Sequence, residues 1–294
     1  MGAIANINVD HLIGQEVGTS TILKELARGG MAIVFIAYQR TLKRQIALKI
    51  LPKKLLTPKT AKRFQSEAES AAILSHPNII PVYDVGETDD FLYFTMQLVQ
   101  GKSLGRMVDM ARKNLLPSRR TIPIEEAVRI TIKVLDALHY AHGQDIVHRD
   151  IKPDNILLEK HTQRPLITDF GVAKVLRGED ERHPMIQGTP VYMPPEQVLG
   201  REVDARSDIY AVGTMLFKML APNLPFPAYS SKTELLKLKI RRKDGLFTKR
   251  PSEVNAYADE ALDRIIFKAT AYRQEDRYAD CRLFQQDLEL YAKD

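Results

Sequence analysis

Short apolar runs, separated by polar or glycine-containing turns, occupy most of about the first hundred residues of the chain. The runs are rich in Ile, Val, Phe and Tyr, which favour extended strands. The predicted strands cover residues 21–27, 33–39, 45–51, 79–85 and 91–99. The first three follow one another after short turns, so the pattern predicts an antiparallel meander, preceded by an irregular lead-in over residues 1–20.

Helical spacing interrupts these strands once and then dominates the rest of the chain. Residues 58–75 place Phe64, Ala68 and Ala72 on one stripe, which predicts a helix. Residues 124–142 place apolar side chains at steps of three and four, which predicts a core-facing helix. Further predicted helices cover residues 207–220, 259–271 and 279–292, and residues 112–123 are predicted to form an exposed loop.

This order of elements predicts an α+β protein with two lobes. The small lobe would be an antiparallel β structure with one helix, and the larger lobe would be mainly α-helical. The two lobes would join near residues 97–101. Clefts between such lobes are common ligand sites, so we expect the chemistry of the chain to lie there.

The composition is that of a globular protein and excludes several classes. Hydrophobic residues make up 44% and charged residues 27% of 294 residues, which is enough for a sizeable core. The single cysteine, Cys281, excludes an internal disulfide framework and fits a reducing cytoplasm. We expect no membrane segment in this chain, because no run reaches the roughly 18 apolar residues of a span.

The charge balance adds a preference for phosphate or acidic partners. Lys and Arg number 43 against 37 Asp and Glu, a formal charge of +6. Without tryptophan or interleaved basic and aromatic residues, this excess does not predict nucleic-acid binding. The basic stretch 237–243 contains Lys237, Lys239 and Arg241. We interpret it as the solvated face of a helix; the alternative is a docking surface for an acidic substrate.

Two loops carry more polar chemistry than packing requires. Residues 148–155 read His-Arg-Asp-Ile-Lys-Pro-Asp-Asn between two apolar segments, and residues 169–171 read Asp-Phe-Gly after another apolar run. Burying so many charges without a task is costly. Asp150, Asn155 and Asp169 could bind Mg²⁺ through oxygen and leave one carboxylate as a base. The alternative is that they only cap loops and turns.

Together the two motifs resemble the catalytic signature of the protein kinase family, H-R-D-x-K-P-x-N followed by D-F-G. Other motifs of that family occur in the expected order over about residues 20–292. Ala47-Leu48-Lys49 resembles the V-A-I-K strand, Glu67 its ion-pair partner, Met193-Pro194-Pro195-Glu196 the A-P-E motif, Asp208 the aspartate that braces the catalytic loop, and Arg277 the arginine that pairs with Glu196. Residues 188–197 are similar to those of bacterial Ser/Thr protein kinases.

The resemblance implies an Mg-ATP-dependent enzyme that phosphorylates protein Ser or Thr hydroxyls. Asp150 would be the catalytic base, and Lys152 would neutralise charge on the moving phosphoryl group. Asn155 and Asp169 would hold the Mg²⁺ ion. Such chemistry needs positioning and charge neutralisation more than covalent participation by the protein.

The resemblance also implies a nucleotide site. Lys49 would contact the α and β phosphates of ATP and pair with Glu67. The family's loop G-x-G-x-x-G-x-V maps onto residues 27–34, where alanine replaces the first and third glycines. Backbone N–H groups could still cradle phosphates there. The nucleotide would further contact Ala27, Gly29, Gly30, Val34, Ala47, Met96, the backbone of Gln97 and Val99, and Leu157.

By the same resemblance the chain is one kinase domain with protein substrates. Its parts would be the lead-in 1–20, a small lobe 21–96, a hinge 97–101 and a large lobe 102–294. Self-association would serve autophosphorylation, and the compartment would be the cytoplasm. One rival is a scaffold that keeps the fold without catalysis, which the altered glycine loop favours. A small-molecule kinase is the other, against which the position of Lys152 and residues 188–196 argue.

Overall fold

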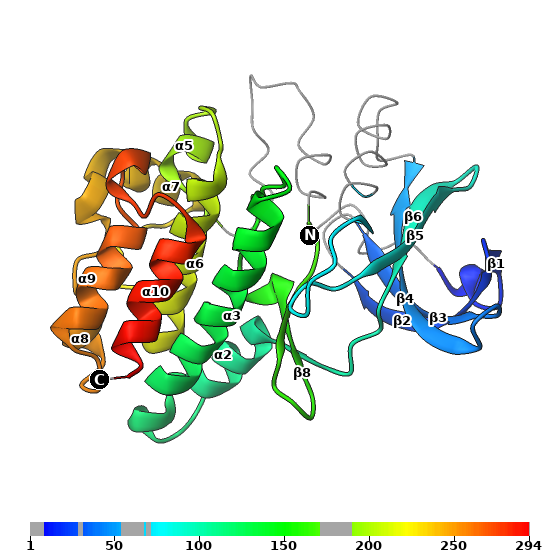
Figure 1. Cartoon of the computed structure of the whole chain (residues 1–294), viewed down its shortest axis with the longest axis horizontal. Coiled ribbons are helices and arrows are strands. Elements are labelled where there is room, and N and C mark those ends of the chain that lie inside the picture. Colours follow the sequence, from blue (N-terminus) through cyan, green and yellow to red (C-terminus); the bar gives the residue numbers. More distant parts are fainter. Residues whose placement is uncertain (1–8, 29–31, 54–67, 69–71, 171–189, 294) are drawn as a thin grey trace. The chain divides into compact units, whose positions relative to one another are not determined.

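The computed structural model describes residues 9–28, 32–53, 68, 72–170 and 190–293, and the chain divides into two compact units. Unit 1 contains the described residues up to Gln100 together with Phe170. Unit 2 contains residues 101–169 and 190–293. Unit 1 is built on a sheet and unit 2 is mostly helical, so the predicted α+β class is confirmed (Figure 1).

In the part of unit 1 that the structure describes, the strands form one antiparallel sheet in the order β1-β2-β3-β4-β6-β5 (Figure 1). Its strands are β1 (Glu16–Val17), β2 (Ser20–Arg28), β3 (Ile33–Gln39), β4 (Arg44–Pro52), β5 (Val82–Glu87) and β6 (Phe91–Met96). The strands predicted at 21–27, 33–39 and 45–51 are confirmed, and they pair as the expected meander. The helix predicted over 58–75 lies mostly outside the described residues.

One face of this sheet carries the hydrophobic core of unit 1. Its side chains alternate along each strand, as the period of a strand requires. They are Ile33, Phe35 and Ala37 of β3, Ile46, Leu48 and Ile50 of β4, and Phe91 and Tyr93 of β6. Val9, Leu12 and Val17 join this cluster, because the 3₁₀ turn η1 (Asp10–Leu12) packs against the sheet and β1 is one of its edge strands. Residues 9–17 therefore differ from the irregular lead-in that the sequence pattern predicts.

The two later strands are shifted relative to their predicted limits. β5 begins at Val82 and not at residue 79, because Pro81 has no N–H to contribute to a ladder. It continues instead to Glu87, which lies opposite Leu92 of β6. β6 ends at Met96, after which the Gln97 N–H donates to the Pro81 carbonyl over 3.2 Å.

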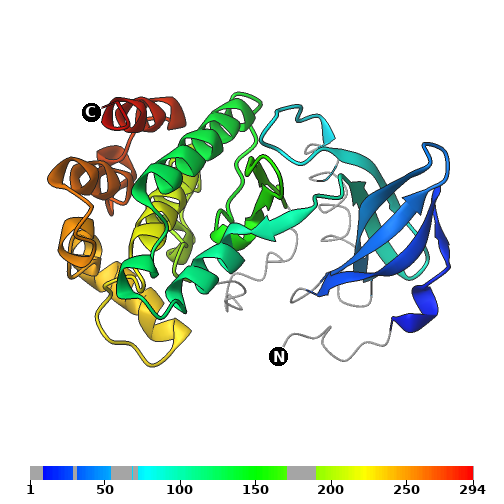
Figure 2. The same cartoon turned by 90° about the horizontal axis from the view of Figure 1, so that it is seen from below.

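Unit 2 combines helices with a small sheet (Figures 1 and 2). The strand order of this sheet is β7-β8-β9. The elements of unit 2 are β7 (Gly101–Ser103), α2 (Leu104–Arg112), α3 (Ile124–His142), β8 (Ile156–Glu159), β9 (Pro165–Ile167), α5 (Pro195–Val198), α6 (Ala205–Leu220), α7 (Lys232–Arg242), α8 (Pro251–Val254), α9 (Glu260–Ala269) and α10 (Cys281–Tyr291). α6 is buried along nearly its whole length. Gly213 permits its close approach to α9, since a Cβ there would lie 2.7 Å from the Ala269 Cβ. In the described part of the chain, no helix has the length and apolar character needed to cross a bilayer.

The helices predicted from residue 124 onward are confirmed as α3, α6, α9 and α10. The last three begin after Asp204, Asp259 and Asp280, whose side chains accept hydrogen bonds from backbone N–H groups of the first turn. α2 was not predicted, although Leu104, Met107, Val108 and Ala111 recur at helical spacing, because its nine residues are fewer than the roughly 11 over which a helical period is judged.

The basic stretch on α7 is not uniformly solvated. Lys239 is 1% exposed, whereas Lys237 is exposed. Burial, followed by the charge of Arg277, lowers the pKa of Lys239 from 10.5 to about 7, although the charge of Glu196 opposes this shift. The interpretation of residues 237–243 as a solvated helix face is therefore wrong at Lys239.

The lowered pKa of Lys239 predicts a pH-dependent contribution to stability. Between about pH 7 and pH 10 the folded chain binds fewer protons at this amine than the unfolded chain, so the folded chain gains relative stability as the pH rises. Compared with Lys239→Met, the free energy of unfolding of the wild-type chain should rise by about 2 kcal/mol from pH 7 to pH 9. Urea unfolding followed by circular dichroism measures the difference at each pH. A difference that stays constant would contradict this prediction.

Candidate functional site

The residues of unit 1 that were predicted to contact a nucleotide share the sheet face opposite its hydrophobic core. Residues directly opposite each other in an antiparallel pair point to the same face. Ala27 lies opposite Val34, and Val34 lies in turn opposite Lys49. Met96 lies opposite Ala47, which is two positions before Lys49 on β4. The register therefore gathers all five side chains on one surface.

Lys49 is the cationic group on this surface that the sequence singled out. Its side chain is buried, with the residue 8% exposed, and its Nζ lies 5.5 Å from the centre of the Phe94 ring on β6. An ammonium group near an aromatic face is attracted by the charge distribution of the ring. Glu67, Gly29 and Gly30, which were predicted to complete this part of the site, lie outside the described residues.

The segment after β6 presents backbone groups instead of side-chain chemistry. Residues 97–100 form neither helix nor strand, and Gln97 and Val99 are both half-buried. The Gln97 N–H is engaged with Pro81, so a hydrogen bond from this residue's backbone to a ligand would use its carbonyl oxygen. This arrangement is compatible with the predicted backbone contacts to a purine.

In unit 2 a hairpin brings the two predicted metal ligands to one end. β8 pairs antiparallel with β9, with Ile156 opposite Ile167. Asn155 directly precedes β8 and Thr168 directly follows β9, and the Thr168 N–H donates to the Asn155 carbonyl over 3.0 Å. Asp169 is the next residue, and its φ of 66° is in the left-handed region. The hairpin register thus explains why residues far apart in sequence are neighbours here.

Leu157 is the predicted nucleotide contact of unit 2. It lies on β8 between Ile156 and Leu158, which are both buried, whereas Leu157 is half-buried. Because side chains alternate across a strand, Leu157 points to the opposite face of the hairpin from these neighbours. Ser103 of β7 lies opposite it in the ladder.

Three of the predicted catalytic and metal-binding side chains are joined by hydrogen bonds. Lys152 Nζ donates to Asp150 Oδ2 over 2.6 Å. The 3₁₀ turn η4 (Pro153–Asn155) brings Asn155 back toward Asp150, and its Nδ2 donates to the Asp150 carbonyl over 2.8 Å and to Oδ2 over 3.2 Å. The carboxylate is held in one orientation, yet 25% of the Asp150 side chain remains exposed. A substrate hydroxyl could therefore reach it.

His148 ties this loop to the strand before Asp169. Its ring is fully buried, with Nε2 2.8 Å from the Thr168 carbonyl and Nδ1 3.2 Å from the Asp150 backbone nitrogen. A carbonyl only accepts and a backbone N–H only donates, so the proton of the neutral ring is on Nε2. Each ring nitrogen of His148 thus makes a hydrogen bond that holds the loop in place.

Asp208 of α6 anchors the same loop. Its carboxylate oxygens accept the N–H groups of His148 over 2.9 Å and of Arg149 over 2.8 Å. The φ of Arg149 is 67°, a conformation that non-glycine residues rarely adopt and that these hydrogen bonds stabilise. Burial alone would raise the pKa of Asp208, but the hydrogen bond and charge of His142 and the proximity of His148 lower it overall. Asp208 therefore braces the loop of residues 148–155, as the resemblance implied.

Asp208 also ends a chain of buried polar contacts that sequence reasoning did not find. His142 Nε2 lies 2.9 Å from Asp208 Oδ2, and Cys281 Sγ lies 3.6 Å from His142 Nδ1. Nε2 of this ring faces the carboxylate, and Nδ1 faces the thiol. Burial, followed by the charge of Asp208, raises the pKa of Cys281, so the thiol keeps its proton. The two residues are 139 positions apart, and no local pattern signals their contact.

The expected pairing of Glu196 with Arg277 is a buried, bidentate salt bridge. Arg277 Nη1 and Nη2 each donate to a different oxygen of Glu196 over 2.8 Å. The side chains are 0% and 4% exposed, and Arg277 Nε also donates to the Ala271 carbonyl over 2.8 Å. The bridge fixes α5, whose Gln197 amide donates to the Arg149 carbonyl over 3.4 Å.

Known proteins are similar to this chain over nearly its whole length. The family described as the protein kinase domain matches residues 20–288. Serine/threonine-protein kinase pkn3 of Myxococcus xanthus is 34% identical over 98% of this chain, and serine/threonine-protein kinase PrkC of Bacillus subtilis is 35% identical over 94%. The chain spans 52% and 41% of these two relatives, respectively.

Solved structures with the same architecture include the PknI kinase domain of Mycobacterium tuberculosis. Its sequence is 27% identical, and its structure is similar with a TM-score of 0.75. The similarity covers 96% of this chain and 99% of that domain. The predicted fold is therefore confirmed at the level of the whole chain.

Proposed function

Because the chain belongs to the protein kinase family, we propose that it transfers the γ-phosphoryl group of ATP to Ser or Thr hydroxyls of proteins. One observation carries the proposal. Asp150, Lys152 and Asn155 are joined by hydrogen bonds, and one backbone hydrogen bond links Asn155 to Thr168, the residue before Asp169. This combination of a base, a cation and two oxygen ligands suits phosphoryl transfer.

Asp150 is the proposed base. Its carboxylate would accept the proton of the substrate hydroxyl while that oxygen forms a bond to the γ phosphorus. The bond from the γ phosphorus to the β–γ bridging oxygen would break, and ADP would leave. Lys152, whose Nζ is 2.6 Å from Asp150 Oδ2, would neutralise negative charge on the transferred group.

Asn155 and Asp169 are the proposed ligands of a divalent metal ion, and we propose Mg²⁺ as that ion. A carboxylate and an amide oxygen are hard ligands, and a small number of protein ligands leaves room for phosphate oxygens and water. Both hydrogen bonds from Asn155 to Asp150 use the amide nitrogen, so its amide oxygen is the group that would coordinate. When bound, the ion would supply further charge neutralisation at the phosphates.

The surface of unit 1 that carries Lys49 is the proposed contact for the nucleotide. Lys49 would donate to the α and β phosphates, and Ala47 and Val34 would offer a shallow apolar surface to the purine. The Gln97 carbonyl and the Val99 backbone would bond to the purine edge, as the resemblance implies. Leu157 is a further proposed apolar contact, and the proposed roles of Glu67, Gly29 and Gly30 concern residues outside the described part of the chain.

The proposal predicts metal-dependent turnover of ATP. With ATP, Mg²⁺ and a library of Ser- and Thr-containing peptides, ADP should form and label from the γ position should move to peptide. EDTA should abolish transfer, and Asp169→Asn should require more Mg²⁺ for the same rate, because one of two proposed protein ligands is weakened. Tight binding of ATP with no ADP at any Mg²⁺ concentration would instead favour the scaffold.

We also propose the surroundings of the enzyme. The lobes would comprise residues 21–96 and 102–294 around a hinge at 97–101, and a reducing cytoplasm would suit the buried free thiol of Cys281. Self-association would allow one copy to phosphorylate another. Mixing a tagged inactive chain with an untagged active one and mapping phosphosites on the tagged chain tests this.

A further inference from the structure

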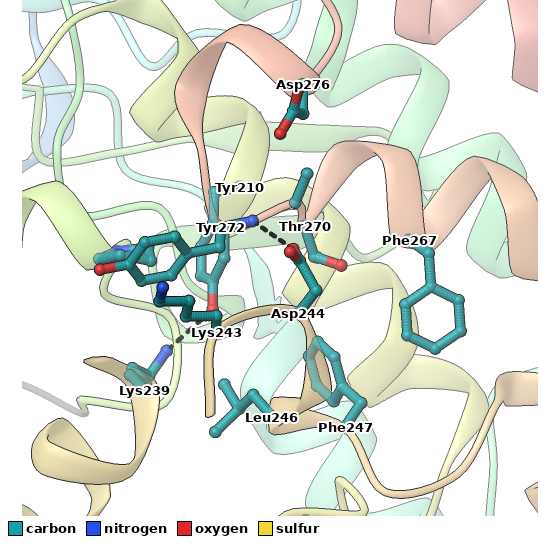
Figure 3. Close-up of a pocket in the computed structure, with 12 residues that line it drawn as sticks. Tyr210, Lys239, Lys243, Asp244, Leu246, Phe247, Phe267, Thr270, Tyr272 and Asp276 are labelled. Carbon is teal, nitrogen blue, oxygen red and sulfur yellow. Dashed lines mark hydrogen bonds between the residues drawn. The ribbon is translucent and has the colours of Figure 1, made fainter. Parts of the chain in front are cut away.

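The buried amine of Lys239 contacts the backbone on either side of Tyr192. From α7, Lys239 Nζ donates to the carbonyls of Val191 over 2.7 Å and of Met193 over 2.9 Å. The Tyr210 hydroxyl lies 3.4 Å from the same nitrogen. Figure 3 shows this contact with Tyr210 at the wall of a cavity of about 260 Å³. One side chain thus meets two carbonyls of a segment 46 and 48 positions earlier.

These contacts satisfy the amine in either protonation state. A neutral amine has two N–H bonds and one lone pair, so it can donate to two carbonyls and accept from the Tyr210 hydroxyl. Burial raises the pKa of Tyr210, so this hydroxyl keeps its proton. Without Lys239, the carbonyls of Val191 and Met193 would lose these donors, which is costly for buried polar groups.

The segment that Lys239 holds adjoins the catalytic loop. Burial and then the negative charges of Asp154 and Asp109 raise the pKa of Tyr192, so its phenol lies within electrostatic reach of both carboxylates. Asp154 belongs to the turn η4 that follows the proposed base. A second link is the hydrogen bond from Gln197 to the Arg149 carbonyl. Backbone shifts near Tyr192 would therefore occur beside the residues that meet a substrate.

We propose that Lys239 is a positioning residue for protein substrates, because it fixes the backbone around Tyr192 as part of the surface that seats the substrate segment beside Asp150. This inference rests on the proposed kinase function and names a determinant of that function outside the sequence motifs described above. Lys239 touches neither nucleotide nor reacting atoms. Its removal should therefore affect the protein substrate more than ATP.

Three variants separate this role from a general effect on packing. Lys239→Met removes the N–H donors and keeps an unbranched side chain, whereas Lys239→Gln restores N–H donors on a shorter side chain. Lys237→Met is the matched control, because it makes the same change two positions away at an exposed site. Lys239→Met should raise the KM for a peptide substrate about tenfold, with the KM for ATP unchanged. Lys239→Gln should recover part of this loss, and Lys237→Met should match the wild type.

Hydrogen exchange of the backbone amides of residues 191–193, which lie between Pro190 and Pro194, gives a readout that does not depend on activity. Exchange there should be faster in Lys239→Met than in the wild type and unchanged in Lys237→Met. An unchanged peptide KM with unchanged exchange would overturn the proposal. It would also be overturned by an equal rise of the ATP KM, or by faster exchange throughout unit 2. If the wild type phosphorylates no peptide, the proposed function fails, while the exchange result still decides whether Lys239 holds this segment.

Discussion

Asp150→Asn should lower kcat for peptide phosphorylation by a factor of about 10² to 10⁴ and leave the KM for ATP close to that of the wild type. The amide has nearly the size of the carboxylate but does not act as a base at neutral pH. The substitution also removes the negative charge that pairs with Lys152, whose Nζ is 2.6 Å from Asp150 Oδ2. The loss should therefore appear in turnover and not in nucleotide binding. Steady-state kinetics with varied ATP and varied peptide measure both parameters.

Asp145→Asn is the matched control for this variant. Asp145 is exposed, lies five positions earlier and has a φ of 58°, a conformation that asparagine tolerates well. Its kcat should equal that of the wild type, and thermal unfolding should confirm that both variants fold. A kcat of Asp150→Asn within about tenfold of the wild-type value would contradict the assignment of Asp150 as base.

Arg277→Met should lower the free energy of unfolding by about 3–5 kcal/mol. The guanidinium is fully buried and makes two 2.8 Å hydrogen bonds to Glu196. Its removal leaves the Glu196 carboxylate buried without this countercharge and frees the Ala271 carbonyl. Such a loss is a large part of the total stability of a typical domain. Urea unfolding at neutral pH, followed by circular dichroism, measures it.

Two further variants test the electrostatic reason for this loss. Arg273→Met removes an arginine that is 70% exposed, so its effect on unfolding should stay within about 0.5 kcal/mol. The double variant Glu196→Met with Arg277→Met should be less destabilised than the sum of the two single variants, because no buried charge is left alone. A loss below about 1 kcal/mol for Arg277→Met would show that the buried bridge does not fix α5.

Much of the fold could be predicted from local patterns, because the elements have strong periods. β3 alternates buried and more exposed side chains, and α3 keeps an unbroken apolar stripe over its 19 residues. α2 was missed because its nine residues give a short stretch in which to recognise a helical period. The start of β5 depended on the missing N–H of Pro81, a detail that a hydrophobic pattern does not contain.

In the candidate site, too, the sequence predicted some contacts and not others. Asp150, Lys152 and Asn155 lie within six residues, so one motif contained the contacts that join them. The approach of Cys281 to His142 depends on the packing of α10 beside α3, which no local pattern encodes (Figure 1). Lys239 was misread for a physical reason. A lysine that reaches carbonyls inside the protein has the same sequence signature as one that reaches water.

The central claim is that this chain moves the γ-phosphoryl group of ATP to aliphatic hydroxyls of a protein. Incubation with γ-labelled ATP and Mg²⁺, followed by acid hydrolysis and separation of the phosphoamino acids, tests it most directly. The account predicts label on phosphoserine and phosphothreonine with the wild type and almost none with Asp150→Asn. Label confined to phosphotyrosine or to a small molecule, or equal labelling by both proteins, would contradict it.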